Sequence, residues 1–518
     1  MNQEAIKGYL NQINYKTYRT ELARALERNP SALPALAGMY EQSRLGKAFP
    51  SAAENIAYTL IGTLTPCWLL LRKWLVAPFK FSKKKQELRL STADDFNGRD
   101  KTIDILIMLG AVYPSLYESA RRIFDNLDGK KASVAALLFP GVGEAKKKDL
   151  DLLQDPYLVS LPDEMLRSSA WELFGAVAKA RRQYQEVAED VKNEHIRALF
   201  HVNRRLLRLL FMFDNFYETT YRRLFARMKP RVIVDNWFNG ALYKVAREMN
   251  IYTVMIQHGT QWGEDKPSIT PDENELLIWG EFWRENFRNL VLPTTKITSL
   301  GCPRFDPLMA FRLMPRDDRF YAALGLKAEK QTVTFLSQSH GFLFPEATKQ
   351  AYLKVVEGLR ALAAARKNEI NFIIKLHPHD DQAYYNALMD EETRRIIVFL
   401  KSEVPLYDIL RHTDVAISVT STALLEALAM DVSIIQFACT GLPDWIDLCS
   451  SGGGFLVNSG EELIGILDDL RTREEARAET RRKRQAFIDH WLVNLGTATD
   501  KTADYLLRVA KELKAGAN

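Results

Sequence analysis

Cysteine is scarce in this sequence, and its few cysteines are not arranged to bind a metal. The 518 residues contain four: Cys67, Cys302, Cys439 and Cys449. They form no Cys-x-x-Cys pair, and no histidine stands at zinc-ligand spacing from them. The first 29 residues also lack the apolar core of a secretory signal. These absences predict a cytoplasmic chain without a structural metal.

A strong charge excess is missing as well. Lysine and arginine total 70, and aspartate and glutamate total 65, which leaves a formal net charge of +5 at pH 7. Nucleic-acid binding needs a concentrated basic face, so we expect no nucleic-acid partner. Hydrophobic residues make up 47% and charged residues 26% of the chain, which is typical of a globular protein. The length predicts roughly two to four domains.

No apolar run is long enough to cross a membrane as a helix. The most apolar stretch, Ile56–Leu71, is shorter than the roughly 20 residues that a spanning helix needs, and it contains Pro66. Trp74 follows it, and then four lysines at positions 80, 83, 84 and 85. This combination is typical of segments at an anionic membrane surface. Two interpretations stay open: segment 56–79 anchors the protein peripherally at the inner face of a bacterial membrane, or it packs internally as helices.

Beyond residue 95, short apolar runs alternate with helical patterns, which favours parallel sheets covered on both faces. Two long helices, expected at 163–190 and 193–227, interrupt the first series. The strands expected in the first series are 102–108, 133–139, 232–234, 252–256, 276–278 and 296–298. Those expected in the second series are 332–336, 371–375, 396–399, 415–418 and 433–436.

The two series predict an α/β protein with two Rossmann-like domains in tandem. We expect a helical N-terminal region over 1–95, a first domain over 96–312, a second domain over 313–490, and a final helix over 491–518. Ligands of such sheets bind at the carboxyl ends of the strands, in a crevice. Candidate functional residues should therefore follow strands directly.

The first candidate group follows the expected strand 252–256. It reads Gln257-His258-Gly259-Thr260. A histidine at a strand end can act as a general base, and Gly259 lets the backbone approach a ligand closely. Asp235, at the end of strand 232–234, is a candidate carboxylate. The alternative for His258 is a hydrogen bond that caps the strand.

The second group follows the expected strand 371–375. Lys375, His377 and His379 alternate there, so they share one side if the segment stays extended. Pro378 interrupts the strand and fixes a turn. Positive and hydrogen-bond-donating groups in one place suit a phosphate or diphosphate leaving group. The alternative is a loop of solvated histidines.

The third group lies where strand 415–418 meets a helix rich in alanine and leucine. Hydroxyls cluster there, and Glu426 follows within about one helical turn. Free amides at a helix start can hold a phosphate, and Glu426 can accept hydrogen bonds from ribose hydroxyls. Helix capping explains the same residues without a ligand. The hydroxyl-bearing residues are Ser418, Thr420, Ser421 and Thr422.

Taken in order, these three groups resemble those of the GT-B transferases that build bacterial surface polymers. The resemblance is to the CDP-glycerol glycerophosphotransferase and capsule polysaccharide transferase group, and it covers roughly residues 230–440. It rests on His258-Gly259, on Lys375-Leu-His377-Pro378, and on Thr420-Ser421-Thr422 with Glu426. Further segments that resemble such enzymes are Leu277–Trp283, Gly301–Asp306 and Pro405–Leu410.

This resemblance implies a fold, an activity and roles. It implies GT-B architecture, with His258 as the base for an acceptor hydroxyl and His377 beside the donor phosphate. Glu264 and Asp265 are alternative bases, because a related group uses a carboxylate near a glycine. Glu426 stands where glycerophosphate transferases more often have aspartate, and this favours a sugar donor.

The expected function is therefore a metal-independent transferase of capsule or cell-envelope biosynthesis that uses no cofactor. Its partners would be a nucleotide-sugar donor, with CMP, UDP or a similar nucleotide, and a glycan, lipid-linked or protein acceptor. Three alternatives stay open. They are a CDP-glycerol-type glycerophosphotransferase, a nucleotide-sugar epimerase, and a non-catalytic, membrane-associated assembly protein on the same fold.

Overall fold

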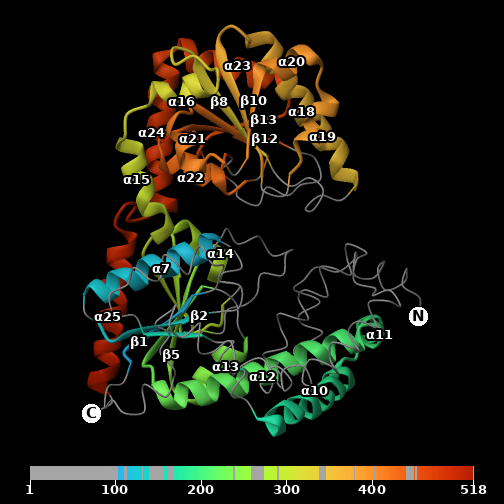
Figure 1. The fold of residues 1–518 in the computed structure, drawn as a ribbon, viewed down its shortest axis with the longest axis vertical. Helices are drawn as coiled ribbons and strands as arrows, with labels where there is room; N and C mark the ends of the chain where they lie inside the picture. Colours follow the sequence, from blue (N-terminus) through green and yellow to red (C-terminus); the bar gives the residue numbers. More distant parts are fainter. Residues whose placement is uncertain are drawn as a thin grey trace, which may run out of the picture.

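The computed structural model shows two lobes, one above the other in Figure 1, each built around a parallel sheet. The residues described are 103–109, 114–130, 132–138, 157–160, 165, 169–236, 240–257, 273–288, 291–337, 346–377, 380–401, 403–419, 421–438, 448–449 and 452–516. The expected N-terminal helical region and its segment 56–79 lie outside them. Within the described residues, no helix combines the length and apolar content that crossing a bilayer requires.

The first domain contains a seven-stranded sheet in the order β3-β2-β1-β4-β5-β6-β7. Neighbouring strands are parallel. Alternate residues of β1 enter two cores, because successive strand side chains face opposite sides of a sheet. In order along the chain, the strands are Ile105–Leu109, Val134–Leu138, Tyr157–Ser160, Val232–Asp235, Tyr252–Ile256, Glu275–Ile278 and Lys296–Ser299.

Helices cover both faces of this sheet. On one face, Ile105 and Ile107 pack with helices α7 (Pro114–Gly129) and α25 (Ala498–Gly516). On the other face, Leu106 and Met108 pack with α12 (Arg204–Met228) and α13 (Gly240–Glu248). These two apolar layers explain why the strands read as uninterrupted hydrophobic runs.

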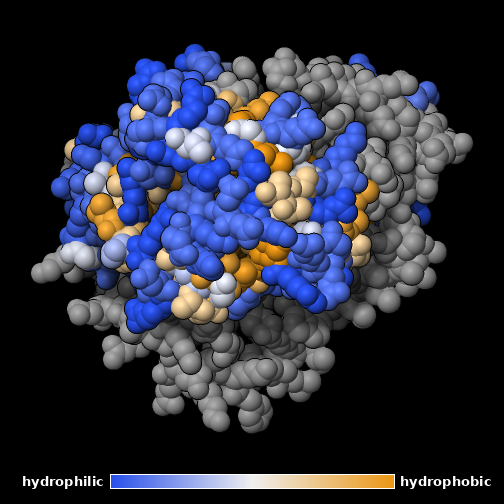
Figure 2. All heavy atoms as spheres, turned by 90° about the horizontal axis from the view of Figure 1, so that it is seen from above, coloured by the Kyte–Doolittle hydropathy of each residue, from blue (hydrophilic) through white to orange (hydrophobic). Residues whose placement is uncertain are grey.

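The second domain contains a six-stranded parallel sheet in the order β10-β9-β8-β11-β12-β13. One face packs against α18 (Glu346–Arg366) and α23 (Gly460–Thr472), and the other against α22 (Ala423–Ala429) and α24 (Glu474–Trp491). Viewed from above in Figure 2, the described surface is mostly hydrophilic, with hydrophobic residues in small separate patches. In order along the chain, the strands are Gln331–Leu336, Ile370–Lys375, Ile397–Leu400, Val415–Ser418, Ser433–Phe437 and Phe455–Val457.

The structure corrects several expected elements. The helix expected at 193–227 is two helices, α11 (Glu194–Val202) and α12, separated at Asn203, whose side chain donates to the Leu199 carbonyl at 3.0 Å. The helix expected from 163 begins as α10 at Ala170, where Ser169 and Glu172 form a capping box. Strands β3 and β13 were not predicted from the sequence. The three residues of β13 carry too little pattern to be recognised.

Two connections join the domains. The first is the segment after β7, which contains the 3-10 helix η3 (Pro303–Phe305) and α15 (Asp306–Leu313), so the expected division between residues 312 and 313 falls at the end of α15. The second runs from α24 to α25 and returns to the first domain, where α25 contacts α7, β1 and β4 (Figure 1). There the Val493 amide donates to the Trp279 carbonyl at 2.9 Å.

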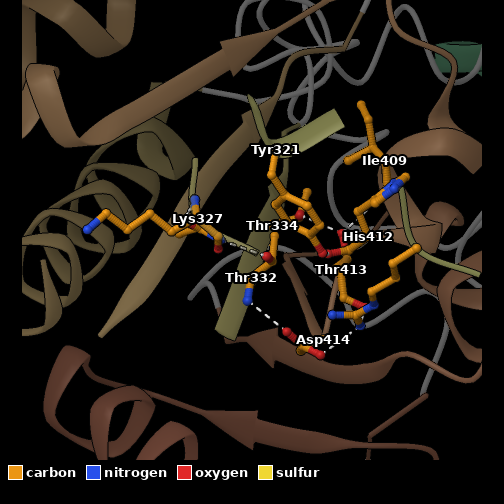
Figure 3. A network of polar contacts seen from close by, with 10 residues as sticks. Tyr321, Lys327, Thr332, Thr334, Ile409, His412, Thr413 and Asp414 are labelled. Carbon is orange, nitrogen blue, oxygen red and sulfur yellow. Dashed lines mark hydrogen bonds and ion pairs between the residues drawn. The ribbon is translucent and has the colours of Figure 1, made fainter. Parts of the chain in front are cut away.

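A polar network holds the amino ends of the parallel strands β8 and β11 together (Figure 3). The Asp414 carboxylate accepts the Thr332 amide at 2.7 Å and pairs with Arg316 at 2.7 Å. The hydroxyls of Thr334 and Thr413 are hydrogen-bonded to each other at 2.7 Å. His412 is fully buried, accepts the Asp317 amide at Nε2 and contacts the Asp408 carbonyl through Nδ1. This histidine is therefore structural and must be neutral to accept at Nε2.

We expect His412 to make stability depend on pH. Burial, helped by Arg411 and Arg316, lowers its pKa below the ordinary 6.5, against opposing contributions from Asp408 and Asp317. The unfolded chain then binds the proton more readily, so stability is lost as pH falls below about 6.5. His412→Gln should be less stable at pH 7.5 by about 1–3 kcal/mol but lose less between pH 7.5 and pH 5. Denaturant unfolding at both pH values measures this, and equal losses in both proteins would contradict it.

Candidate functional site

The order of the strands in each sheet indicates where its ligand-binding crevice lies. In the second sheet, β8 comes first in the chain, the next strands extend to one side, and β11 begins the other side. The crevice of such a sheet lies where this order reverses, at the carboxyl ends of β8 and β11. Ser337 follows β8, and Ser418 ends β11. His377 follows the neighbouring β9, whose Lys375 is in register with Leu336. The second and third sequence groups therefore flank this crevice.

A buried network holds the turn at His377. The Ser337 hydroxyl accepts the His377 amide at 2.9 Å and donates to the Asp380 carboxylate at 2.6 Å. The Asp380 amide in turn donates to the His377 carbonyl at 2.8 Å. Tyr385 donates to the same carboxylate at 2.8 Å, and burial raises the pKa of this tyrosine well above its usual value. The backbone of His377 is thus fixed by Ser337, at the end of β8, and by Asp380 of the same turn, and its side chain is half-buried.

Lys375 and Lys401 meet beside this turn. Lys375 Nζ donates to the Lys401 carbonyl, and Lys401 Nζ donates to the Asp380 carbonyl at 3.2 Å. Burial lowers the pKa of Lys375 below its usual value, and nearby Glu403 opposes this. The structure therefore places the Lys375 ammonium toward the end of β10, which is separated by β9 from β8 and the crevice, so the expectation that Lys375 shares one side with His377 is not met.

The hydroxyls of the third group have different surroundings. Ser418 is fully buried, and its hydroxyl donates to the Leu336 carbonyl at 2.7 Å, which ties β11 to β8. Ser421 accepts the Ala423 amide at 3.3 Å. Thr422 is the N-cap of α22, and its side chain makes no capping hydrogen bond. Ser421 and Thr422 thus stand at the crevice rim, whereas Ser418 braces the strands beneath it.

Glu426 lies one turn into the seven-residue helix α22 and is 9% exposed. Arg304 of η3 faces it, with Nη2 3.9 Å from Glu426 Oε1. The Arg304 guanidinium also lies over the Trp279 ring, 5.4 Å from its centroid. Tyr407 and Glu118 act electrostatically on the same carboxylate. Two of the further segments that carry the resemblance, through Arg304 and Tyr407, therefore act on Glu426, and the third contacts Arg304 through Trp279.

In the first domain, Asp235 ends β4, beside the corresponding reversal between β1 and β4. It is 2% exposed, and its carboxylate accepts the Asn236 amide at 2.9 Å and the Tyr243 hydroxyl at 3.3 Å. Gln257, at the end of β5, accepts the Trp279 amide through its side chain at 2.9 Å. Six candidates lie outside the described residues: His258, Gly259, Glu264, Asp265, His379 and Thr420.

Sequence reasoning missed three residues of this site. Ser337 and Asp380 fix the His377 turn, and Arg304 faces Glu426. Asp380 could have been predicted, because it directly follows the turn that Pro378 is expected to fix. An aspartate beside a turn often accepts hydrogen bonds from the backbone of that turn. Ser337 directly follows the expected strand 332–336, which was a usable signal, and Arg304 lies in the resembling segment Gly301–Asp306. The roles of both depend on which strands and domains are neighbours, and the sequence does not show this.

Comparisons with known proteins find the same architecture. The UDP-GlcNAc 2-epimerase of Neisseria meningitidis, bound to UDP-GlcNAc, has a TM-score of 0.53 and 11% identity, covering 78% of this chain and all of the epimerase. A glycosyltransferase of Rickettsia africae has a TM-score of 0.51 and 13% identity, covering 79% of this chain and 99% of its own. No protein family and no curated protein matches the sequence. The structural likeness establishes the fold: this chain has the two-domain GT-B fold.

Proposed function

We propose that this protein is a glycosyltransferase that moves a sugar from a nucleotide-activated donor to a hydroxyl of a cell-surface glycan, lipid or protein acceptor. The observation that supports this best is the crevice of the second sheet. Ser337, His377 and the start of α22 flank the point where strand order reverses, and Glu426 stands one turn into α22. A nucleotide diphosphate needs this combination of donors for its phosphates and a carboxylate for its hydroxyls.

In this proposal the donor lies on the second domain. His377 and the amides at the start of α22 stabilise the charge that develops on the leaving phosphate. No metal ion is required, because these protein groups balance that charge. His379 would extend the positive surroundings of the phosphates, while Ser421 and Thr422 offer hydroxyl donors. Lys375, whose ammonium bonds to the Lys401 carbonyl instead, would act on the phosphates only from a distance. Ser418 would act indirectly, by holding β11 against β8.

The acceptor would lie on the first domain. His258, at the end of β5, is the proposed base that removes the proton from the acceptor hydroxyl. Asp235 and Glu264 are the alternatives. Asp235 already accepts two hydrogen bonds, so part of its accepting capacity is used within the protein. Closure of the two domains would remove water from the cleft. We place the reaction in capsule or envelope assembly, at the cytoplasmic face of the membrane.

Nucleotide binding tests the proposal directly. We expect the full-length protein to bind at least one of CMP, CDP, UDP and GDP, with a dissociation constant on the order of 1 µM to 1 mM. Isothermal titration calorimetry measures this without knowledge of the acceptor. Absence of binding for all four would favour the non-catalytic assembly protein instead.

Product analysis then separates the enzyme classes. With a nucleotide-sugar such as UDP-GlcNAc, a transferase releases the nucleotide and needs an acceptor, whereas an epimerase converts the donor without one. Turnover of CDP-glycerol in preference to nucleotide-sugars would identify the glycerophosphotransferase alternative.

A further inference from the structure

Arg304 is buried at the junction of the two domains. It belongs to η3, which contacts α7 and α25 of the first domain. Its side chain is 9% exposed and lies over the rings of Trp279 and Phe305, 5.4 Å and 4.7 Å from their centroids. Glu426, in contrast, belongs to α22 of the second domain. The pair therefore spans the junction.

The hydrogen-bonding capacity of Arg304 is not satisfied within the described part of the chain. Its buried Nε has no hydrogen-bond partner there, and the guanidinium has a side-chain hydrogen bond only with the Cys302 thiol. The nearest carboxylate oxygen, Glu426 Oε1, is 3.9 Å from Nη2, which is beyond hydrogen-bond distance. The adjacent Cys302 is no counter-ion, because burial raises the pKa of its thiol to about 12. A buried guanidinium with an unpaired N–H group is costly, so an oxygen-bearing ligand would stabilise it.

The carboxyl group of Glu426 is also buried. Burial raises the pKa of its carboxyl above the usual value, Glu118 of α7 adds to this, and Arg304 opposes it. Tyr407 of α21 (Leu406–Arg411) also faces the carboxylate. Arg304 is thus the positive group among those that act on Glu426, and without it the carboxyl would be protonated more readily.

A hydroxyl group is the chemical partner that suits both side chains. It donates one hydrogen bond and accepts others, so it can donate to a carboxylate while accepting from a guanidinium. The two oppositely charged groups are 3.9 Å apart and form no direct hydrogen bond, so one hydroxyl oxygen could bond to both. We infer that Arg304 and Glu426 form a hydroxyl-binding pair for the donor, in which Arg304 positions Glu426 and donates a hydrogen bond to a ligand oxygen.

This inference rests on the proposed function, because the hydroxyls are those of a nucleotide donor. They belong either to the ribose or to the transferred sugar. Since Arg304 is fixed to the first domain and Glu426 to the second, a hydroxyl between them would also favour the closed arrangement of the domains. Arg304 would then contribute to donor affinity rather than to the chemical step.

The experiment compares Arg304→Gln and Arg304→Lys with the unchanged protein. Calorimetry would measure binding of UDP and CDP, of their 2′-deoxy and 3′-deoxy forms, and of UDP-GlcNAc and CDP-glycerol. We expect Arg304→Gln to weaken binding of the hydroxyl-bearing ligand about tenfold or more, and Arg304→Lys to restore part of it. Arg316→Gln, which removes an arginine from the Asp414 ion pair at the far edge of the sheet, is the matched control and should bind normally.

The ligand series locates the hydroxyl. If Arg304→Gln and the unchanged protein bind a deoxyribose nucleotide with the same affinity, the ribose hydroxyl is the group that binds Arg304 and Glu426. If the loss occurs only with UDP-GlcNAc or CDP-glycerol, the transferred group does. If the unchanged protein binds a ligand and Arg304→Gln binds all of them equally well, the inference is wrong while the proposed function stands. If the unchanged protein binds no nucleotide, the proposed function fails and takes the inference with it.

A pH series separates positioning from a loss of structure. Removal of the Arg304 charge should raise the pKa of Glu426 further, so that the carboxyl stays protonated to higher pH. The affinity lost in Arg304→Gln should therefore be largest at acidic pH and shrink as pH rises. A structural defect would weaken binding by the same factor at every pH, and that outcome would overturn the positioning role.

Discussion

Replacement of His377 by alanine is expected to lower turnover of the donor by about 10²- to 10⁴-fold. The half-buried imidazole stands at the edge of the crevice, where the leaving phosphate develops charge in the proposed reaction. Loss of this group removes an interaction that is strongest in the transition state, so kcat should fall far more than donor affinity.

The fold of this variant should remain intact, because the network around His377 uses its backbone. Ser337 accepts its amide, and Asp380 donates to its carbonyl, and alanine preserves both contacts. His201→Ala, at an exposed position on α11, is the matched control and should show unchanged turnover. Release of nucleotide from the donor measures both. A folded His377→Ala protein with turnover like that of the control would exclude this role.

The second large effect concerns stability. Gly301 lies where the crossover between α24 and α25 meets the first domain, with a φ of +93°. A Cβ at this position would be 2.2 Å from the Val493 carbonyl oxygen and 2.8 Å from the Ala498 side chain. Gly301→Ala combines an unfavourable backbone conformation with this overlap, so we expect a loss of about 4 kcal/mol in the free energy of unfolding.

Gly325 provides the matched comparison. Its φ is +67°, yet a Cβ there would meet nothing within 4 Å. Gly325→Ala should therefore cost only the backbone term, about 1 kcal/mol. Denaturant unfolding of both variants isolates the steric part, provided the unfolding transition stays cooperative. Equal losses would show that the crossover yields to the extra methyl group and that its close contact with Gly301 contributes little.

The sheets were predictable because their strands are buried on both faces. Runs such as Tyr252–Ile256 and Val415–Ser418 carry enough β-branched and apolar residues to be located to the residue. Phe455–Val457 is too short for that. Asn203 divides two helices because its side chain bonds to the Leu199 carbonyl, which no periodicity indicates.

The site was predictable only in part. A residue that directly follows a strand, such as His377, is assigned to the crevice edge by the sheet topology alone. Which hydroxyl faces the crevice depends on pairings that the sequence does not reveal, and Ser418 instead binds the Leu336 carbonyl. Arg304 could not be assigned, because its environment comes from segments around Trp279 and Glu426 that belong to different domains.

The return of α25 to the first domain has a consequence for how the protein folds during synthesis. Asn126 on α7 bonds to Asp500 on α25, 374 residues later in the chain. Until the ribosome has made α25, the face of the first sheet that carries Ile105 and Ile107 lacks its cover by Leu506 and Val509. The second domain, whose strands and helices lie between these partners, can complete its core earlier. The N-terminal half would then be the last to reach its native state, contrary to the usual order of folding from the N-terminus, and would depend on chaperones in the interval.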